Sequence, residues 1–203
     1  MRLINSIGPN PKMVRMFLAE LGLKLEIVDI DLMKGENRQH QHLQRNPSGQ
    51  SPVLELDDGS CLAEITVICE YLAEMNGGSD LIGTTPAERA ETRMWTRRID
   101  LQIIEPLLNG FRFSEGLDLF RDRVRCMPQA ADDLKTLAQE RIAWLDGLIA
   151  TKTFICGDRF SMADIHLFSS LEFGVQVGQP LNADNENILA WYDRVSERAS
   201  ASA

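Results

Sequence analysis

Cysteine and histidine are scarce in this chain of 203 residues, and neither forms a metal-site or redox motif. The four cysteines include no Cys-x-x-Cys pair, and their spacing fits neither a zinc site nor a disulfide framework. Of the three histidines, His40 and His42 are neighbours, but no third ligand lies near them. We therefore expect no metal, and we expect reduced thiols in a cytoplasmic protein.

Long apolar runs and an excess of base are also missing. No run reaches the roughly 18 apolar residues of a membrane span, and the apolar opening at 2–6 is too short for a signal peptide. Lysine and arginine number 21 against 30 acidic residues, a net charge of −9, which disfavours nucleic acid. We expect neither a membrane nor a nucleic acid as partner. The 44% of hydrophobic residues suffice for a sizeable core.

The first 78 residues alternate between strand and helix patterns. Apolar side chains recur at helical spacing from residue 12 to Gly22, and the polar segment 34–46 holds one weak helical turn. A further helix is predicted over 62–76. The predicted strands are 2–6, 25–30 (expected to be buried), 52–56 and 60–63. The order β-α-β-α-β-β-α predicts an α/β domain with a mixed sheet.

No strand pattern follows the polar linker expected at 79–85. Pro106 is expected to kink or end the first helix of this part. Ser161 and Asp164 form an S-x-x-D capping box at the start of another. The predicted helices are 87–108, 118–126, 130–149, 161–175 and 186–198. The chain is thus expected to join an α/β domain, 1–78, to an all-helical domain, 86–203.

Two motifs of the first domain are compatible with a peptide site. Pro52 leads a strand, and a cis bond before it would leave the Ser51 backbone free to pair with an extended peptide. Glu64 precedes a helix whose free N–H groups attract carboxylates, and it could accept from a ligand ammonium. The alternatives are an ordinary strand-leading proline and an ordinary acidic helix start. In the helical domain, Phe111 and Phe113, with Arg112 between them, could floor an apolar pocket, or the two rings could simply pack in the core.

These pieces, in this order, resemble the cytosolic glutathione transferase family, and the run from Pro86 to Pro106 is similar to its bacterial and fungal branch. The segments that carry the resemblance are 8–20, 46–59, 62–72 and 154–164. The resemblance covers nearly the whole chain. It implies an N-terminal thioredoxin-like domain, a C-terminal helical bundle, and a homodimer formed along the long helix at 93–100.

The resemblance also implies a site for glutathione at the edge of the first domain. The Ser51 backbone would pair with the cysteinyl unit, and Glu64 would hold the γ-glutamyl end. Arg38, with Gln50 beside it, would meet the glycine carboxylate, while Asp100 would reach the partner's site. Phe111 and Phe113 would line the apolar substrate pocket. The implied glutathione-binding residues are Arg38, Gln50, Ser51, Pro52, Glu64, Ile65 and Asp100.

Two departures from the family pattern concern the chemistry. Ile65 stands where the family commonly has Ser or Thr. One hydroxyl contact to the ligand carboxylate is then lost, unless Thr66 supplies it. The family's Tyr, Ser or Cys near the first helix falls at about Gly8, so the candidates for stabilising the thiolate are Ser6, Asn10 and the helix start.

The resemblance therefore implies an enzyme of detoxification, in which glutathione is the co-substrate and its thiolate attacks an apolar electrophile. The alternative is a non-catalytic glutathione- or ligand-binding protein of the same fold. Disulfide reduction is disfavoured, because residues 1–60 contain no cysteine.

Overall fold

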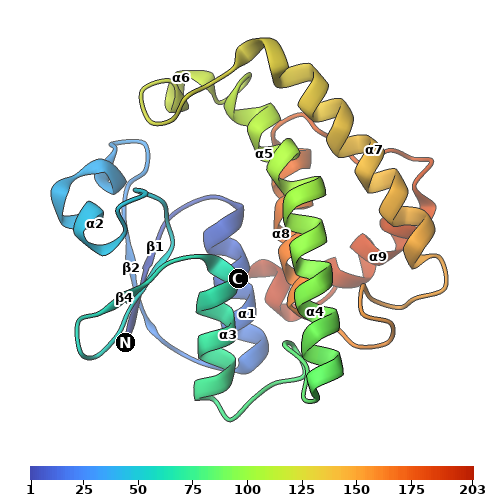
Figure 1. The fold of residues 1–203 in the computed structure, drawn as a ribbon, viewed down its shortest axis with the longest axis horizontal. Coiled ribbons are helices and arrows are strands. Elements are labelled where there is room, and N and C mark those ends of the chain that lie inside the picture. Colours follow the sequence, from blue (N-terminus) through green and yellow to red (C-terminus); the bar gives the residue numbers. More distant parts are fainter.

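A four-stranded mixed sheet organises the N-terminal part of the computed structural model, which describes residues 1–203 (Figure 1). β1 (Arg2–Asn5) pairs in parallel with β2 (Glu26–Asp29) and antiparallel with β3 (Val53–Glu55). β3 pairs antiparallel with β4 (Cys61–Leu62), which gives the order β2-β1-β3-β4. The predicted mixed sheet and its element order are confirmed.

The helices of this part are α1 (Pro9–Leu21), α2 (His40–Arg45) and α3 (Ile65–Met75), with a 3₁₀ turn at Glu36–Arg38. α1 and α3 pack together, and their apolar faces enter the core. Gly22 ends α1 at φ 65°, a left-handed conformation that glycine adopts without steric cost.

The prediction of a buried strand at 25–30 was wrong. β2 is an edge strand that pairs only with β1, and Ile27 is 47% exposed. The alternating pattern identified the strand correctly, but its position in the sheet decided its burial. An edge strand keeps one flank in solvent whatever its composition.

The C-terminal part is a helical domain. α4 and α5 follow one another as a rod through the centre of the molecule, and α7 packs against α5 and the turn that precedes it (Figure 1). Within α8, every residue from Met162 to Leu171 is buried, which makes this helix the centre of the domain. The helices are α4 (Pro86–Ile99), α5 (Glu105–Arg112), α6 (Leu117–Phe120), α7 (Ala131–Ile149), α8 (Met162–Gln176) and α9 (Glu186–Ser196), with 3₁₀ turns at Pro128–Ala130 and Ala199–Ser202.

The rod does not end at Pro106. A π-helical turn, Asp100–Ile104, joins α4 to α5, and Pro106 lies in the first turn of α5. Proline has no N–H to give to the carbonyl of Gln102, and its ring crowds that carbonyl. The wider π-turn accommodates both effects and redirects the side chains that follow.

The helix predicted over 118–126 is mostly absent. α6 stops at Phe120, and the chain continues as turns. Residues 121–125 carry four charges around Val124, which is itself 37% exposed. Short helices depend on packing an apolar face, and this segment has none to pack.

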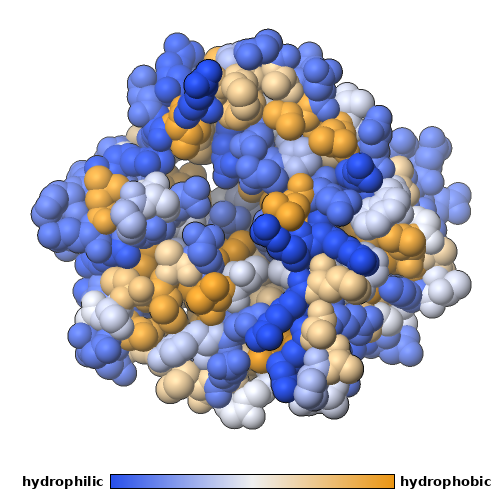
Figure 2. Space-filling view, in the orientation of Figure 1, coloured by the Kyte–Doolittle hydropathy of each residue, from blue (hydrophilic) through white to orange (hydrophobic).

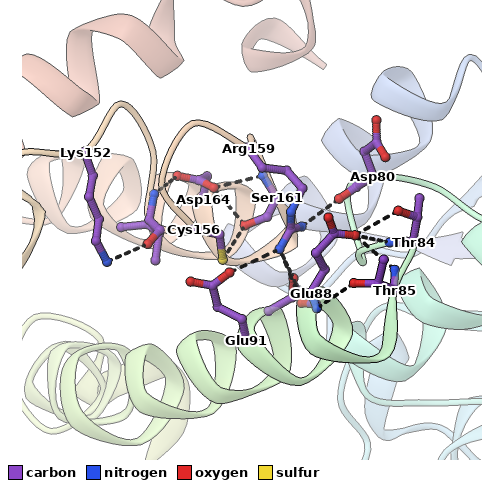
Figure 3. A network of polar contacts seen from close by, with 12 residues as sticks. Asp80, Thr84, Thr85, Glu88, Glu91, Lys152, Cys156, Arg159, Ser161 and Asp164 are labelled. Atoms are coloured by element: carbon purple, nitrogen blue, oxygen red, sulfur yellow. Dashed lines mark hydrogen bonds and ion pairs between the residues drawn. The ribbon is translucent and has the colours of Figure 1, made fainter.

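The segment before α4 is tied down by a polar network (Figure 3). Thr85 accepts from the Glu88 N–H, while the Glu88 carboxylate accepts from the N–H groups of Thr84 and Thr85 and from the Thr84 hydroxyl. These hydrogen bonds lower the pKa of Glu88 to about 2. Arg159 donates to the Asp80 carbonyl (2.7 Å), which links this segment to the start of α8.

Glu88 should therefore contribute to the acid sensitivity of the fold. A carboxyl whose folded pKa is lowered from 4.5 to about 2 stabilises the fold above pH 4.5 and loses that contribution as the pH falls toward 2. We expect Glu88→Gln to lower the Tm at pH 6 and to match the Tm of wild type near pH 2. The Tm of the variant should therefore fall less than that of wild type as the pH decreases. Thermal melts across this range test it, with exposed Glu140→Gln as control. Parallel Tm–pH profiles for wild type and Glu88→Gln would contradict it.

None of the helices combines the length and apolar character that a membrane span requires.

Candidate functional site

A cavity of about 240 Å³ lies between the N-terminal domain and the helical domain, where Figure 2 shows a recess. The N-terminal domain contributes Asn10, Asn46, Gln50, Ser51, Pro52, Glu64, Ile65 and Thr66. The helical domain contributes Asp100, Ile104, Glu105, Leu108, Arg112 and His166. Most of the residues expected at a glutathione site thus meet here.

The loop before β3 forms one wall, and the Ser51–Pro52 peptide bond is cis, as expected. The Gln50 carbonyl accepts from His42 Nε2 (2.8 Å) and from the Asn46 amide (3.0 Å). Asn37 donates to the Gly49 carbonyl at 2.6 Å. These three side chains are buried, so the polar segment 34–46 serves to hold the loop. The sequence analysis did not anticipate this support.

The start of α3 forms a second wall. Glu64 has φ 68° and is the only non-glycine residue with a positive φ. Such a conformation costs about 1–3 kcal/mol and persists where the surroundings impose it, often at functional sites. No side chain caps α3, so the N–H groups of Ile65 and Thr66 remain free at the cavity wall. The site pairs a carboxylate with main-chain donors, which suits a ligand carrying both an ammonium and a carboxylate.

The start of α1 contributes a single residue, Asn10. Pro9 and Pro11 have no N–H, and the Lys12 N–H bonds to the Gly8 carbonyl. Asn10 therefore carries the one free main-chain donor of this first turn, together with its side-chain amide.

Two predicted residues lie beside the cavity rather than on it. Ser6 is 4% exposed, and its Oγ lies 2.9 Å from Ser51 Oγ. Ser51 is part of the lining, whereas Ser6 is not. Arg38 donates to the Ser48 carbonyl (3.1 Å) and packs against Gly49, the residue before Gln50 of the lining.

The structure does not place Phe111 and Phe113 in the lining of this cavity, where they were expected as walls of the apolar pocket. Phe113 is 5% exposed in the core, and Phe111 packs edge-on against Phe173, with centroids 5.0 Å apart. Ile104 and Leu108 provide the apolar surface instead.

The helical wall is charged, and the sequence analysis did not anticipate Glu105 and His166 there. Asp100 Oδ1 lies 3.5 Å from Nε2 of His166, and this contact lowers the pKa of Asp100. Neither His166 nitrogen has a hydrogen-bond partner, and both are sealed from solvent. Arg112 is the only arginine in the lining, which contains no lysine. Residues 100, 104, 108 and 112 recur every four positions and share one face of the rod.

The molecule therefore combines a thioredoxin-like domain, a helical domain, and a polar cavity between them. The family description "Glutathione S-transferase, N-terminal domain" matches residues 1–74, and "Glutathione S-transferase, C-terminal domain" matches residues 127–199. Glutathione S-transferase 2 of Saccharomyces cerevisiae is 34% identical over 200 residues, covering 95% of this chain and 84% of that protein.

Comparison with solved structures leads to the same family. Gtt2 from Saccharomyces cerevisiae superposes with a TM-score of 0.93 at 32% identity, covering 100% of this chain and 99% of that one. A glutathione S-transferase domain-containing protein from Marinobacter aquaeolei VT8 gives 0.92 at 34%, covering 98% and 99%. The chain belongs to the glutathione S-transferase family, a family of transferases that use glutathione, and it is a transferase of that family.

Proposed function

We propose that this protein conjugates the thiolate of glutathione to electrophilic small molecules bound against the helical wall. The observation that carries the proposal is the convergence of three elements on one cavity: the cis-proline loop, the start of α3 and the start of α1. Each offers a different kind of contact, and together they match the parts of a tripeptide that ends in a γ-glutamyl group.

The N-terminal wall supports a placement for glutathione. The Ser51 backbone, beside Pro52, pairs with the cysteinyl unit as one strand pairs with another. Glu64 takes the γ-glutamyl ammonium, and the free N–H groups at Ile65 and Thr66 take its carboxylate. Gln50 lies on the side of the glycine end, with Arg38 just beyond it. Asp100 faces the cavity of its own chain and adds negative charge on the ammonium side.

The opposite wall supports the second substrate. The thiol, held at Pro52, points toward the start of α1 and the apolar surface of Ile104 and Leu108. Stabilising the thiolate and holding the electrophile beside it would accelerate conjugation relative to the uncatalysed reaction. The alternative is a protein of the same fold that binds glutathione without turnover.

Retention on immobilised glutathione, followed by conjugation assays with a panel of electrophiles, tests both candidates. We expect wild type to be retained and active. Glu64→Gly should weaken glutathione about tenfold or more, because it removes a charged contact worth roughly 1.5–3 kcal/mol. Glycine relieves the positive φ, so this variant should fold at least as stably as Glu64→Ala.

Retention without turnover of any electrophile would favour the binding protein. Equal retention of wild type and Glu64→Gly would place glutathione elsewhere. Exposed Glu140→Ala is the matched loss of one acidic charge away from the cavity.

We also propose that the protein works as a cytoplasmic homodimer through α3 and α4. Arg93 binds Glu70 with two hydrogen bonds (2.9 and 2.8 Å), which joins these helices into one face. Val67, Met94 and Leu101 are exposed on the same two helices and the turn that follows α4. A second copy would cover them. Light scattering at micromolar concentration should give the mass of two chains, and Met94→Glu should halve it. A monomeric wild type would refute the proposal.

A further inference from the structure

Arg112 stands out on the helical wall because its charge makes no direct ion pair, although Glu105 lies near enough to act on it electrostatically. No carboxylate oxygen lies within 4.0 Å of its guanidinium, although the chain makes twelve ion pairs elsewhere. The side chain is half-buried, and burial lowers its pKa. A cation held in this way gains from an anion that enters the cavity.

Its hydrogen-bonding capacity is also largely unused. A guanidinium has five N–H groups. One donates to the Asn109 side-chain oxygen (2.9 Å), and no other protein acceptor lies within reach. The remaining donors are not sealed from solvent, in contrast to the nitrogens of His166 on the same wall. They are available to a ligand.

Two consecutive hydrogen bonds hold Arg112 in place. The Asn109 amide donates to Glu105 Oε1 (2.7 Å), while its oxygen accepts from Arg112. The Arg112 guanidinium also lies 5.8 Å from the centre of the Phe120 ring. Glu105 thus orients Arg112 through Asn109 without neutralising it by direct contact. The other acidic residues of the lining, Glu64 and Asp100, are committed by the proposed function to the γ-glutamyl side.

We infer that Arg112 is a specificity-determining residue that binds a carboxylate on the electrophilic substrate. The inference rests on the proposed function and names the substrate class: a conjugated enone or similar acceptor that carries a carboxylate several atoms from the reacting carbon. In the reaction, the thiolate sulfur bonds to the β-carbon, and the π pair moves to the carbonyl oxygen. The enolate then takes a proton from water, and the thiol proton has already left to solvent. Arg112 takes no part in these bonds.

The experiment compares 4-acryloylbenzoic acid with its methyl ester, two acceptors of nearly equal shape that differ in charge. Initial rates are corrected for the uncatalysed reaction. Wild type should prefer the acid in kcat/KM. Arg112→Gln should raise KM for the acid about tenfold or more and leave KM for the ester and for glutathione unchanged. Arg112→Lys should restore part of the preference, because it keeps the charge but loses the paired geometry. Arg141→Gln, at an exposed site on α7, is the charge-matched control.

Three outcomes overturn the inference. An equal loss of kcat on acid and ester would mean that Arg112 acts on the sulfur. A raised KM for glutathione would mean that it binds the tripeptide. If wild type shows the same kcat/KM for acid and ester, the site does not recognise a carboxylate on the substrate.

If neither acceptor reacts, calorimetry still decides the inference, and the panel of electrophiles decides the proposed function separately. The probes are then 4-propionylbenzoic acid and its methyl ester, added to protein saturated with S-methylglutathione. Tighter binding of the acid, lost in Arg112→Gln, supports the role of Arg112. Equal binding of acid and ester overturns it.

Discussion

Asp164→Ala is expected to lower the free energy of unfolding by about 3 kcal/mol or more. The carboxylate is fully buried at the first turn of α8 and accepts four hydrogen bonds. Oδ1 accepts from the Ile155 N–H and the Trp191 indole, both at 2.9 Å. Oδ2 accepts from the N–H and hydroxyl of Ser161. Each buried donor left without an acceptor costs about 1–3 kcal/mol, so the four together dominate the change.

A graded series separates this network from simple loss of volume. Asp164→Asn keeps one oxygen for Ile155 and Trp191 but turns an amide donor toward Ser161, so it should fall between wild type and alanine. Ser161→Ala removes only the cap hydroxyl and should cost about 1 kcal/mol. Urea unfolding followed by circular dichroism gives the values. A loss below 1 kcal/mol for Asp164→Ala would show that water or rearrangement replaces the carboxylate.

The network also shows what the sequence could predict about the fold. The S-x-x-D spacing at Ser161 predicted the capping box, because capping is a local interaction between residues three apart. It could not predict that Trp191, 27 residues away, donates to the same carboxylate. The element order of the N-terminal sheet was likewise readable from local patterns. The exposure of β2 was not, because it depends on which strand lies beside it.

The candidate site divides in the same way. Residues of the N-terminal wall lie in short motifs, and most of those predicted reach the cavity. The helical wall depends on how a long rod is rotated, and the π-turn at Asp100–Ile104 shifts that rotation. Phe111 and Phe113 do not line the cavity, while Leu108, one helical turn earlier, and Arg112, between the two rings in sequence, do. Which side chains face the cavity after such a turn depends on the turn's geometry and on tertiary packing, and local sequence patterns do not show either.

Asn10→Ala is expected to raise the pKa of the bound glutathione thiol by about one to two units. We infer that Asn10, rather than Ser6, stabilises the thiolate, because Asn10 lines the cavity, whereas Ser6 is outside the lining and its hydroxyl bonds to Ser51. A hydrogen bond to an ionised group is worth about 1.5–3 kcal/mol, and one pKa unit corresponds to 1.36 kcal/mol. Asn10→Ala removes the amide but keeps the free main-chain N–H and the positive end of α1, so part of the stabilisation survives.

The sign of the pH dependence follows from this change. A donor to the thiolate lowers the thiol pKa, so its removal shifts ionisation to higher pH. At pH 6.5, kcat/KM of Asn10→Ala should be about 10–100 times lower than that of wild type, and the two should converge as the pH rises above both thiol pKa values. Asn10→Asp should lose more, because its carboxylate repels the thiolate.

Ultraviolet titration of the thiolate in the glutathione complex measures the pKa directly, and Ser6→Ala tests the assignment. If Ser6→Ala raises the thiol pKa while Asn10→Ala does not, then Ser51 moves aside when glutathione binds and Ser6 carries the role. If neither variant changes it, the main-chain N–H of Asn10 and the start of α1 suffice. A wild-type thiol that titrates like free glutathione would remove conjugation altogether and leave a glutathione-binding protein, because no group of the cavity would then favour the ionised sulfur.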